Sequence, residues 1–235
     1  MPSALHPWNL SPTDAVALQY ELAKQIRLEC TPAMARAGIG RIAGVDIGFE
    51  DGGETTRAAV VVLAWQPGTT EHLQVIEQVV HREPTRMPYI PGLLSYREVP
   101  AALGAFAKLS RYPDLVMVDG QGIAHPRRIG VASHLGLWLE LPTIGIAKSR
   151  LCGRFEPVGE ARLSTSELTH RGETIGVVLR SREKVKPVFV SPGHLIDQAS
   201  ALDWVIRCLH KTKLPEPTRM ADRLASRRDR PKTAG

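Results

Sequence analysis

The sequence predicts a single α/β domain in which a mixed β-sheet is flanked by helices. Three strand-like segments in succession, at residues 41–49, 57–65 and 73–81, are separated by Gly52-Gly53 and Pro67-Gly68, which is the pattern of an antiparallel meander. Later apolar segments alternate with helical ones, as in βαβ units. No linker-like stretch and no internal repeat interrupts the 235 residues, so one domain is favoured over two.

The predicted elements follow one another in a simple order. A first helix begins at Ser11-Pro12-Thr13-Asp14, with a hydroxyl cap and a proline in the first turn, and ends near Arg27. After the meander we expect a helix at 95–109, a strand buried on both faces at 115–118, a helix at 128–140, strands at 143–147, 174–180 and 188–190, and a closing helix at 197–210. Residues 226–235 are basic and polar, which predicts a solvated, poorly ordered tail.

Composition narrows the class of protein only moderately. The formal charge of +6 permits a polyanionic partner without requiring one. The three cysteines, Cys30, Cys152 and Cys208, are far apart and show no metal-binding spacing, which indicates a reducing cytoplasm. The longest apolar run, residues 58–65, is too short to span a bilayer, and the first residues lack a signal-peptide pattern. We therefore expect a cytoplasmic protein without membrane association.

A proline-bounded segment, Pro88-Tyr89-Ile90-Pro91-Gly92, is the most informative local feature. Each proline fixes its own φ and disfavours helix at the preceding residue, so the segment is predicted to be an ordered loop. Tyr89 and Ile90 are then either a plug that packs into the core or a rigid apolar wedge that points outward. The local pattern leaves both alternatives open.

Three carboxylates stand out against their surroundings. Asp46 interrupts an apolar strand, and Asp119 directly follows the strand at 115–118. Carboxylates at strand ends in an open α/β sheet tend to face the crevice at the carboxyl edge, so both could meet at one site, although a turn or cap role is the alternative for each. Glu98 is also the fourth residue of a possible capping box that begins at Ser95. Spacing alone does not decide among these roles.

From about residue 25 to residue 225, the sequence resembles the endonuclease V family of metal-dependent nucleases in deaminated-base repair. The resemblance rests on motifs that occur in order, namely Gly44-Val45-Asp46-Ile47-Gly48-Phe49, Met87-Pro88-Tyr89-Ile90-Pro91-Gly92, Ser95-Tyr96-Arg97-Glu98, Val118-Asp119-Gly120, His125-Pro126-Arg127-Arg128, Gly145-Ile146-Ala147-Lys148 and Leu214-Pro215-Glu216-Pro217-Thr218-Arg219. It implies a ribonuclease H-like fold and a catalytic domain at residues 1–225. It also implies hydrolysis of the second phosphodiester bond 3′ to hypoxanthine, leaving a 3′-hydroxyl and a 5′-phosphate.

The same resemblance implies roles for particular residues. Asp46, Glu98 and Asp119 would bind Mg²⁺, with Mn²⁺ as a substitute, and hard oxygen ligands of this kind suit such an ion. Lys148 and His125 would act at the scissile phosphate, and Asp222 would have an outer-shell or second-metal role. The wedge would be formed by Pro88, Tyr89, Ile90, Pro91 and Gly92.

A base pocket is expected where glycines let the main chain approach a ring closely. The candidates are Gly120, Gly122, Leu151 and Gly153. The expected partner is nucleic acid that contains deaminated bases, with DNA favoured over RNA. We expect the protein to bind it as a monomer.

Three alternative functions predict different activities toward nucleic acid. Another ribonuclease H-like structure-specific nuclease would share the carboxylates but would not depend on inosine. A non-catalytic nucleic-acid binder would show no turnover with magnesium. A protein-interaction domain that uses the Tyr89 loop as a hot spot would have no affinity for nucleic acid.

Overall fold

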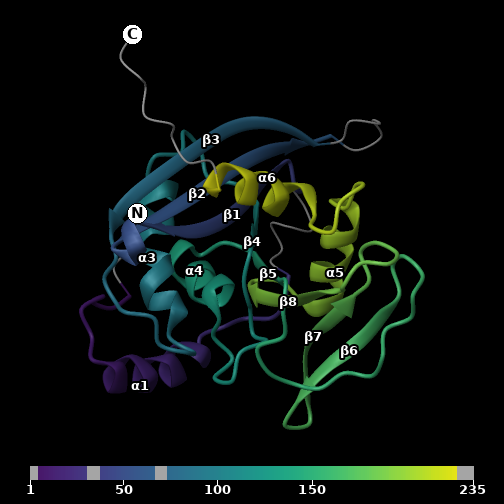
Figure 1. Ribbon diagram of the computed structural model, residues 1–235, viewed down its shortest axis with the longest axis horizontal. Coiled ribbons are helices and arrows are strands. Elements are labelled where there is room, and N and C mark those ends of the chain that lie inside the picture. The colour runs from purple at the N-terminus through teal and green to yellow at the C-terminus, as the bar shows by residue number, and fades with distance from the viewer. Residues whose placement is uncertain (1–4, 31–37, 67–72, 227–235) are drawn as a thin grey trace.

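The protein is described here by a computed structural model that covers residues 5–30, 38–66 and 73–226 (Figure 1). In this described part of the chain, eight strands form one mixed sheet in the order β3-β2-β1-β4-β5-β8-β7-β6. The strands are β1 (Arg41–Glu50), β2 (Thr55–Trp65), β3 (Leu73–Pro84), β4 (Leu115–Val118), β5 (Thr143–Ala147), β6 (Thr165–His170), β7 (Glu173–Leu179) and β8 (Val188–His194).

The sheet has an antiparallel part on each side of a parallel centre. Strands β1, β2 and β3 form the predicted meander, while β1, β4 and β5 run parallel, with helix α4 (Val131–Leu139) connecting β4 to β5. Strands β8, β7 and β6 then pair antiparallel beyond β5. The chain thus forms one βαβ unit at this point, and three antiparallel strands follow it in place of the further units that the alternation suggested.

Helices cover both faces of the sheet. Helix α3 (Leu94–Phe106) and α4 pack on one face, against residues such as Val45, Val60 and Val118. Helix α5 (Gln198–Arg207) packs on the other face against Met117 and Val190, and α6 (Glu216–Ala225) covers β1 and β2 on that same face. Helix α1 (Pro12–Ala23) lies outside α3 and α4. Because side chains alternate between the faces of a strand, β4 is buried on both sides, as its apolar run predicts.

Two elements differ from the prediction for identifiable reasons. Strand β6 is an edge strand in which Leu168 is the one buried residue, so its polar sequence carries no strand pattern. Helix α6 begins at Glu216-Pro217, and a proline in the first helical turn is tolerated because its missing N–H would have no partner there. The Pro67-Gly68 turn, and all of the predicted tail except Ser226, lie outside the described residues.

None of the helices in the described ranges has the length and apolar content needed to span a lipid bilayer.

Candidate active site

Two aspartates meet where the parallel pairing of β1 with β4 ends. Val45 of β1 pairs with Val118 of β4, and the amide of Asp119 donates to the carbonyl of Val45 at 2.9 Å. Asp46 and Asp119 are the next residues along each strand, so their side chains leave the sheet together. By the alternation of the strand they point to the face that α6 covers. The structure therefore brings these two predicted residues together.

Helix α6 adds the carboxylate of Asp222. The helix lies directly on β1 because Gly44 has no side chain: a Cβ at this position would overlap the backbone carbonyl of Pro217 in the first turn of α6. As a result, one carboxylate oxygen each from Asp46, Asp119 and Asp222 lie within 4.8 Å of one another. Three hard oxygen donors at this spacing fit a divalent cation such as Mg²⁺.

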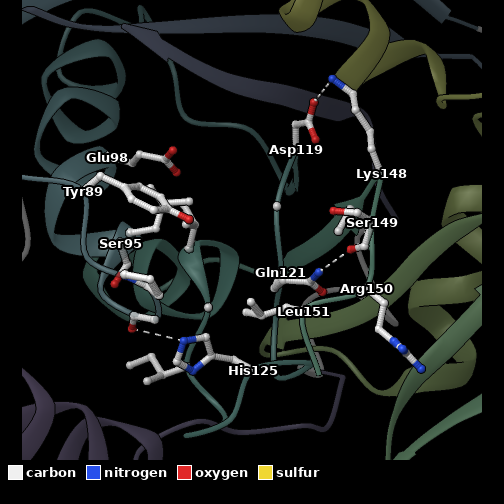
Figure 2. Close-up of a pocket in the computed structure, with 18 residues that line it drawn as sticks. Tyr89, Ser95, Glu98, Asp119, Gln121, His125, Lys148, Ser149, Arg150 and Leu151 are labelled. Atoms are coloured by element: carbon white, nitrogen blue, oxygen red, sulfur yellow. Dashed lines mark hydrogen bonds and ion pairs between the residues drawn. The ribbon is translucent and has the colours of Figure 1, made fainter. Parts of the chain in front are cut away.

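Lys148 places a positive charge among these carboxylates. It directly follows β5, and its Nζ lies 2.5 Å from Oδ2 of Asp119 (Figure 2). The same Nζ lies 2.6 Å from Oδ1 of Asp222. Burial opposes the charge of the ammonium, but hydrogen bonds and the charges of both aspartates outweigh it and raise the pKa of Lys148. The lysine is thus cationic, and its ammonium reaches the position where negative charge is concentrated.

Burial and mutual repulsion make Asp46 and Asp119 harder to ionise. Burial, followed by the charges of Asp119 and Asp222, raises the pKa of Asp46 to about 7, with Lys148 opposing the rise. Burial also raises the pKa of Asp119, against the hydrogen bond from Lys148. Crowded, partly desolvated carboxylates are typical of functional sites, because a bound cation relieves their repulsion.

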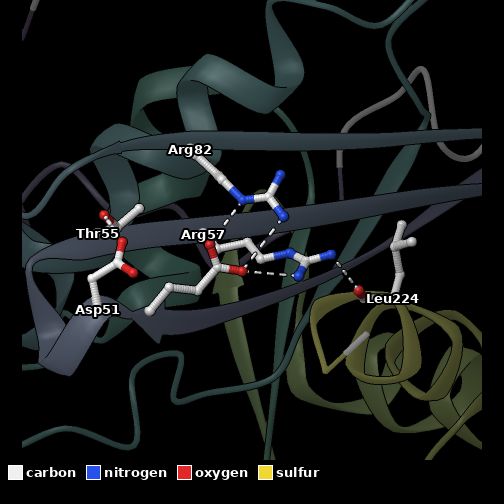
Figure 3. Close-up of polar contacts among 6 residues, drawn as sticks. Asp51, Thr55, Arg57, Arg82 and Leu224 are labelled. Carbon is white, nitrogen blue, oxygen red and sulfur yellow. Dashed lines mark hydrogen bonds and ion pairs between the residues drawn. The ribbon is translucent and has the colours of Figure 1, made fainter. Parts of the chain in front are cut away.

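A buried arginine anchors the far end of α6. The guanidinium of Arg57 in β2, which is 3% exposed, donates to the carbonyl of Leu224 at 3.0 Å and to Oε1 of Glu50 at 2.9 Å (Figure 3). Arg82 of β3 donates to the second oxygen of Glu50 at 2.8 Å. The helix that carries Asp222 is therefore tied at its last turn to the same strands that it covers.

Glu98 lies across the site from Asp119 (Figure 2). It is a buried residue of α3, outside the tight group of three aspartates, and burial, followed by the charges of Asp46 and Asp119, raises its pKa well above the ordinary value. The capping-box alternative does not form, because α3 begins at Leu94 with Leu93 as an uncapped N-cap residue. Ser95 instead hydrogen-bonds with Nδ1 of His134 at 2.9 Å. The carboxylate of Glu98 is therefore available to the site.

A cavity of about 310 Å³ connects the carboxylates with the proline-bounded loop. This size is at the lower end of the range for small-molecule sites. Nine of the residues that the sequence singled out line it: Tyr89, Pro91, Gly92, Glu98, Asp119, Gly120, His125, Lys148 and Leu151.

Of the two roles expected for the loop, outward wedge and core plug, the structure assigns one to each of two neighbouring side chains. Tyr89 is 67% exposed at the mouth of the cavity, whereas Ile90 packs against the buried cluster of Met87, Leu93 and Tyr96. Tyr89 thus has the exposure of a wedge, and Ile90 is a plug that holds the loop down.

Six of the predicted site residues do not line the cavity: Asp46 and Asp222, which meet the cavity-lining Asp119, and Pro88, Ile90, Gly122 and Gly153. Pro88 and Ile90 belong to the loop behind Tyr89. Gly122 packs against the backbone of Pro192, where a Cβ would overlap the carbonyl, and Gly153 has a φ of +88° beside β6. Both glycines therefore shape the backbone around the cavity and do not form its wall.

Some contacts around the cavity were not apparent from the sequence. The carbonyl of Gly92 accepts hydrogen bonds from Gln19, His125 and Arg127. Gln19 is fully buried in α1, 73 residues away in the sequence. Its polar side chain on an otherwise apolar helix face is the one signal that could have identified it.

Comparisons with known proteins agree over nearly the whole chain. The model of the family described as Endonuclease V matches residues 20–223. The chain is 51% identical over 223 residues to an endonuclease V of Nostoc, which covers 95% of this chain and 97% of that protein. A crystal structure of endonuclease V from Streptomyces avermitilis has a TM-score of 0.83 at 39% identity and covers 93% of this chain and 92% of that one.

A further solved structure contains nucleic acid. Ciona intestinalis endonuclease V, in complex with a 24-mer DNA that contains an inosine followed by a ribo-adenosine, has a TM-score of 0.74 at 25% identity. The alignment covers 91% of this chain and 95% of that one. These similarities confirm the predicted fold class and the resemblance seen in the motifs.

Proposed function

The chain belongs to the endonuclease V family, and we propose that it hydrolyses the second phosphodiester bond 3′ to a hypoxanthine base, leaving a 3′-hydroxyl and a 5′-phosphate. Membership of this family makes the chain a nuclease. The observation that carries the proposal is the convergence of Asp46, Asp119 and Asp222 beside a cavity bordered by Tyr89. The inosine-containing DNA bound by the Ciona relative supports the choice of base.

In the proposed site, Asp46, Asp119, Glu98 and Asp222 would hold a divalent metal ion. Their oxygens suit Mg²⁺, with Mn²⁺ as a substitute. When bound, the ion would supply charge neutralisation at the phosphate and activation of the attacking water. The raised pKa values of Asp46 and Asp119 support this assignment, because each carboxylate is costly to ionise until a cation joins it.

Lys148 contributes a second positive charge beside Asp119 and Asp222. Lys148 lines the cavity and its ammonium is held by Asp119 and Asp222, so we expect it to contact a scissile phosphate bound beside these carboxylates. In the transition state it stabilises the charge that develops on the phosphate oxygens. No side chain needs to act as a covalent nucleophile.

The cavity is proposed to receive the hypoxanthine after it leaves the helical stack. Gly92, Gly120 and Leu151 line the wall, and glycines allow the main chain to come close to a ring. Tyr89 fills the space that the base leaves, where stacking on neighbouring bases offsets part of the unstacking energy.

We also propose a domain extent, an oligomeric state, a substrate preference and a location for this enzyme. Residues 1–225 form its catalytic domain, and it acts as a monomer, on DNA in preference to RNA. The three cysteines are free, which supports a reducing cytoplasm as its location.

Matched oligonucleotides test the proposed reaction. Labelled DNA and RNA strands, each with one inosine or with adenosine at that position, are incubated in Mg²⁺ or in EDTA, and the product ends are mapped. We expect a cut at the second phosphodiester bond 3′ to inosine, in Mg²⁺ only, and none by Asp119→Asn. Equal cleavage of the adenosine strands would indicate a structure-specific nuclease, and binding without turnover would indicate a silent binder.

A further inference from the structure

The carbonyl oxygen of Gly92 is the meeting point of three hydrogen-bond donors. It accepts from Nε2 of Gln19 at 3.0 Å, from an NH2 group of Arg127 at 2.8 Å and from Nε2 of His125 at 3.2 Å. A carbonyl oxygen has two lone pairs, so three donors, one of them cationic, saturate it. Such convergence on one backbone atom of an exposed loop fixes the position of that loop.

The donors are also fixed to one another. Oε1 of Gln19 accepts a hydrogen bond of 2.5 Å from Nε of Arg127, so both ends of the amide are engaged. Gln19 is 0% exposed, and a buried amide whose partners are removed is destabilising. Gln19, Arg127 and Gly92 therefore form a closed triangle, here called the Gly92 clamp, in which each member orients the other two.

His125 makes a further hydrogen bond to the Gly92 clamp, and its contacts define its tautomer. Its Nε2 donates to Gly92, so in the neutral ring Nδ1 is the acceptor, and it accepts from the amide of Arg127 at 3.2 Å. Burial and the neighbouring charge of Arg127 lower the pKa of His125 to about 4, so the ring is neutral at pH 7. Both ring nitrogens are engaged inside the protein, so the ring holds the Gly92 carbonyl and the Arg127 amide at fixed positions.

The clamp acts on the turn that carries Tyr89. Gly92 has a φ of +80°, and a Cβ there would lie 2.6 Å from the Arg127 guanidinium, so the close contact requires glycine. The amide of Leu93 donates to the carbonyl of Ile90 at 3.0 Å and closes the turn. Fixing Gly92 thus fixes the position from which Tyr89, three residues earlier, projects.

Helix α1 is the support on which this turn rests. Ala15 of α1 packs in the same buried cluster as Leu93 and Tyr96, and the hydroxyl of Tyr96 donates to the carbonyl of Ala15 at 2.9 Å. The amide of Gln19 bonds to Gly92 and Arg127, whereas Asp46, Asp119 and Asp222 are carried by β1, the end of β4 and α6. Loss of this amide should therefore affect the wedge before it affects these three aspartates.

We infer that Gln19, Arg127 and His125 are positioning residues that hold the Tyr89 wedge through the carbonyl of Gly92. This inference rests on the proposed function, since it concerns how that site opens a duplex. A wedge matters when the base must leave a paired helix, and much less in a single strand that is already partly unstacked. The clamp should therefore control the ratio of duplex to single-strand cleavage.

The variant Gln19→Leu tests the inference, because it removes both hydrogen bonds of the amide while keeping the side chain close to its original volume. Gln25→Leu is the matched control, since it makes the same change at an exposed position just beyond α1. Both proteins and the wild type are assayed on one inosine-containing strand, alone and paired, at a single salt concentration. We expect Gln19→Leu to lower the duplex to single-strand ratio about tenfold, with the control unchanged.

Hydrogen–deuterium exchange supplies a readout that does not need cleavage. In Gln19→Leu the amides of residues 88–95 should exchange faster than in the wild type and in Gln25→Leu, because the turn has lost its anchor. If Gln19→Leu does not fold, Arg127→Lys takes its place. It keeps the charge but loses the planar fork that reaches both Gln19 and Gly92.

The outcomes separate the inference from the proposed function. A wild type that cleaves no inosine strand would overturn the proposed function, while exchange at residues 88–95 would still decide whether the clamp holds the loop. Unchanged exchange together with an unchanged ratio would overturn the clamp. An equal loss on both substrates would also overturn it, since the residues would then support the chemistry and not the wedge.

Discussion

Replacing Gly44 by alanine should separate the packing of α6 from the chemistry of the aspartates. Gly44 lies two residues before Asp46 on β1, and a Cβ there would overlap the carbonyl of Pro217 and lie 2.8 Å from the amide nitrogen of Thr218. Both obstacles are backbone atoms of α6, so no side chain can rotate away. The helix, with Asp222 on it, must retreat from the strand.

The expected effect has two parts. Overpacking of this kind costs about 1–3 kcal/mol, and the backbone obstacle places Gly44→Ala near the upper end of that range. For a chain of this size, about 3 kcal/mol corresponds to a fall in melting temperature of roughly 6–12 °C. A displacement of about 1 Å at a catalytic group can lower the rate by about a hundredfold, so cleavage of the single inosine strand should fall by that order.

Gly48→Ala is the matched control on the same strand, because a Cβ at Gly48 would meet nothing within 4 Å. Melting temperature and the single-strand cleavage rate are measured for both variants across a range of Mg²⁺ concentrations. The lost rate of Gly44→Ala should be partly recovered at high Mg²⁺, since a displaced Asp222 weakens metal binding. If the two variants melt and cleave alike, the close approach of α6 to Gly44 does not position Asp222.

Three further predictions concern individual side chains of the site. Tyr89→Ala should lower cleavage of an inosine-containing duplex by roughly ten- to a hundredfold and that of the single strand distinctly less; equal losses in the two rate measurements would make Tyr89 a wall of the pocket. Glu98→Gln should lower activity by orders of magnitude without lowering the melting temperature, because it removes a carboxylate whose pKa burial raises; retained activity with lower stability would assign Glu98 a structural role. In EDTA, stability should fall as the pH rises from about 4 through about 7, because the folded protein keeps a proton on Asp46 that the unfolded chain releases. Melting temperatures measured across this pH range should depend less on pH with Mg²⁺ or in Asp46→Asn. The same dependence in all three cases would contradict the raised pKa of Asp46.

Local patterns were sufficient to predict most of the sheet and its helices. The meander of β1, β2 and β3 was readable because its apolar residues run between turn residues, and β4 because all four of its residues are apolar. These signals come from residues close together in the chain. The edge strand β6 and helix α6 were missed because their burial depends on partners elsewhere, which a local pattern does not contain.

The site divides in a similar way. Asp46 and Asp119 could be predicted to meet because each stands where an apolar strand ends or is interrupted, and the ends of parallel strands share one edge. Asp222 was expected from the resemblance alone. Its helix was not predicted, and it reaches β1 through a close contact that Gly44 permits, which no local pattern reveals. Its place beside Lys148 is a tertiary result.

By itself, therefore, the sequence determined every strand of the described residues except β6, the carboxylates Asp46 and Asp119, the proline-stiffened loop and the family. The tertiary structure decided which side chain of that loop faces outward, that Glu98 is not a helix cap, and that Gln19 meets Gly92 across 73 residues. The physical reason is one of range. Backbone stiffness and apolar periodicity act between neighbours in the chain, whereas burial, charge repulsion and the sharing of one carbonyl oxygen by three donors exist only once distant segments have packed together.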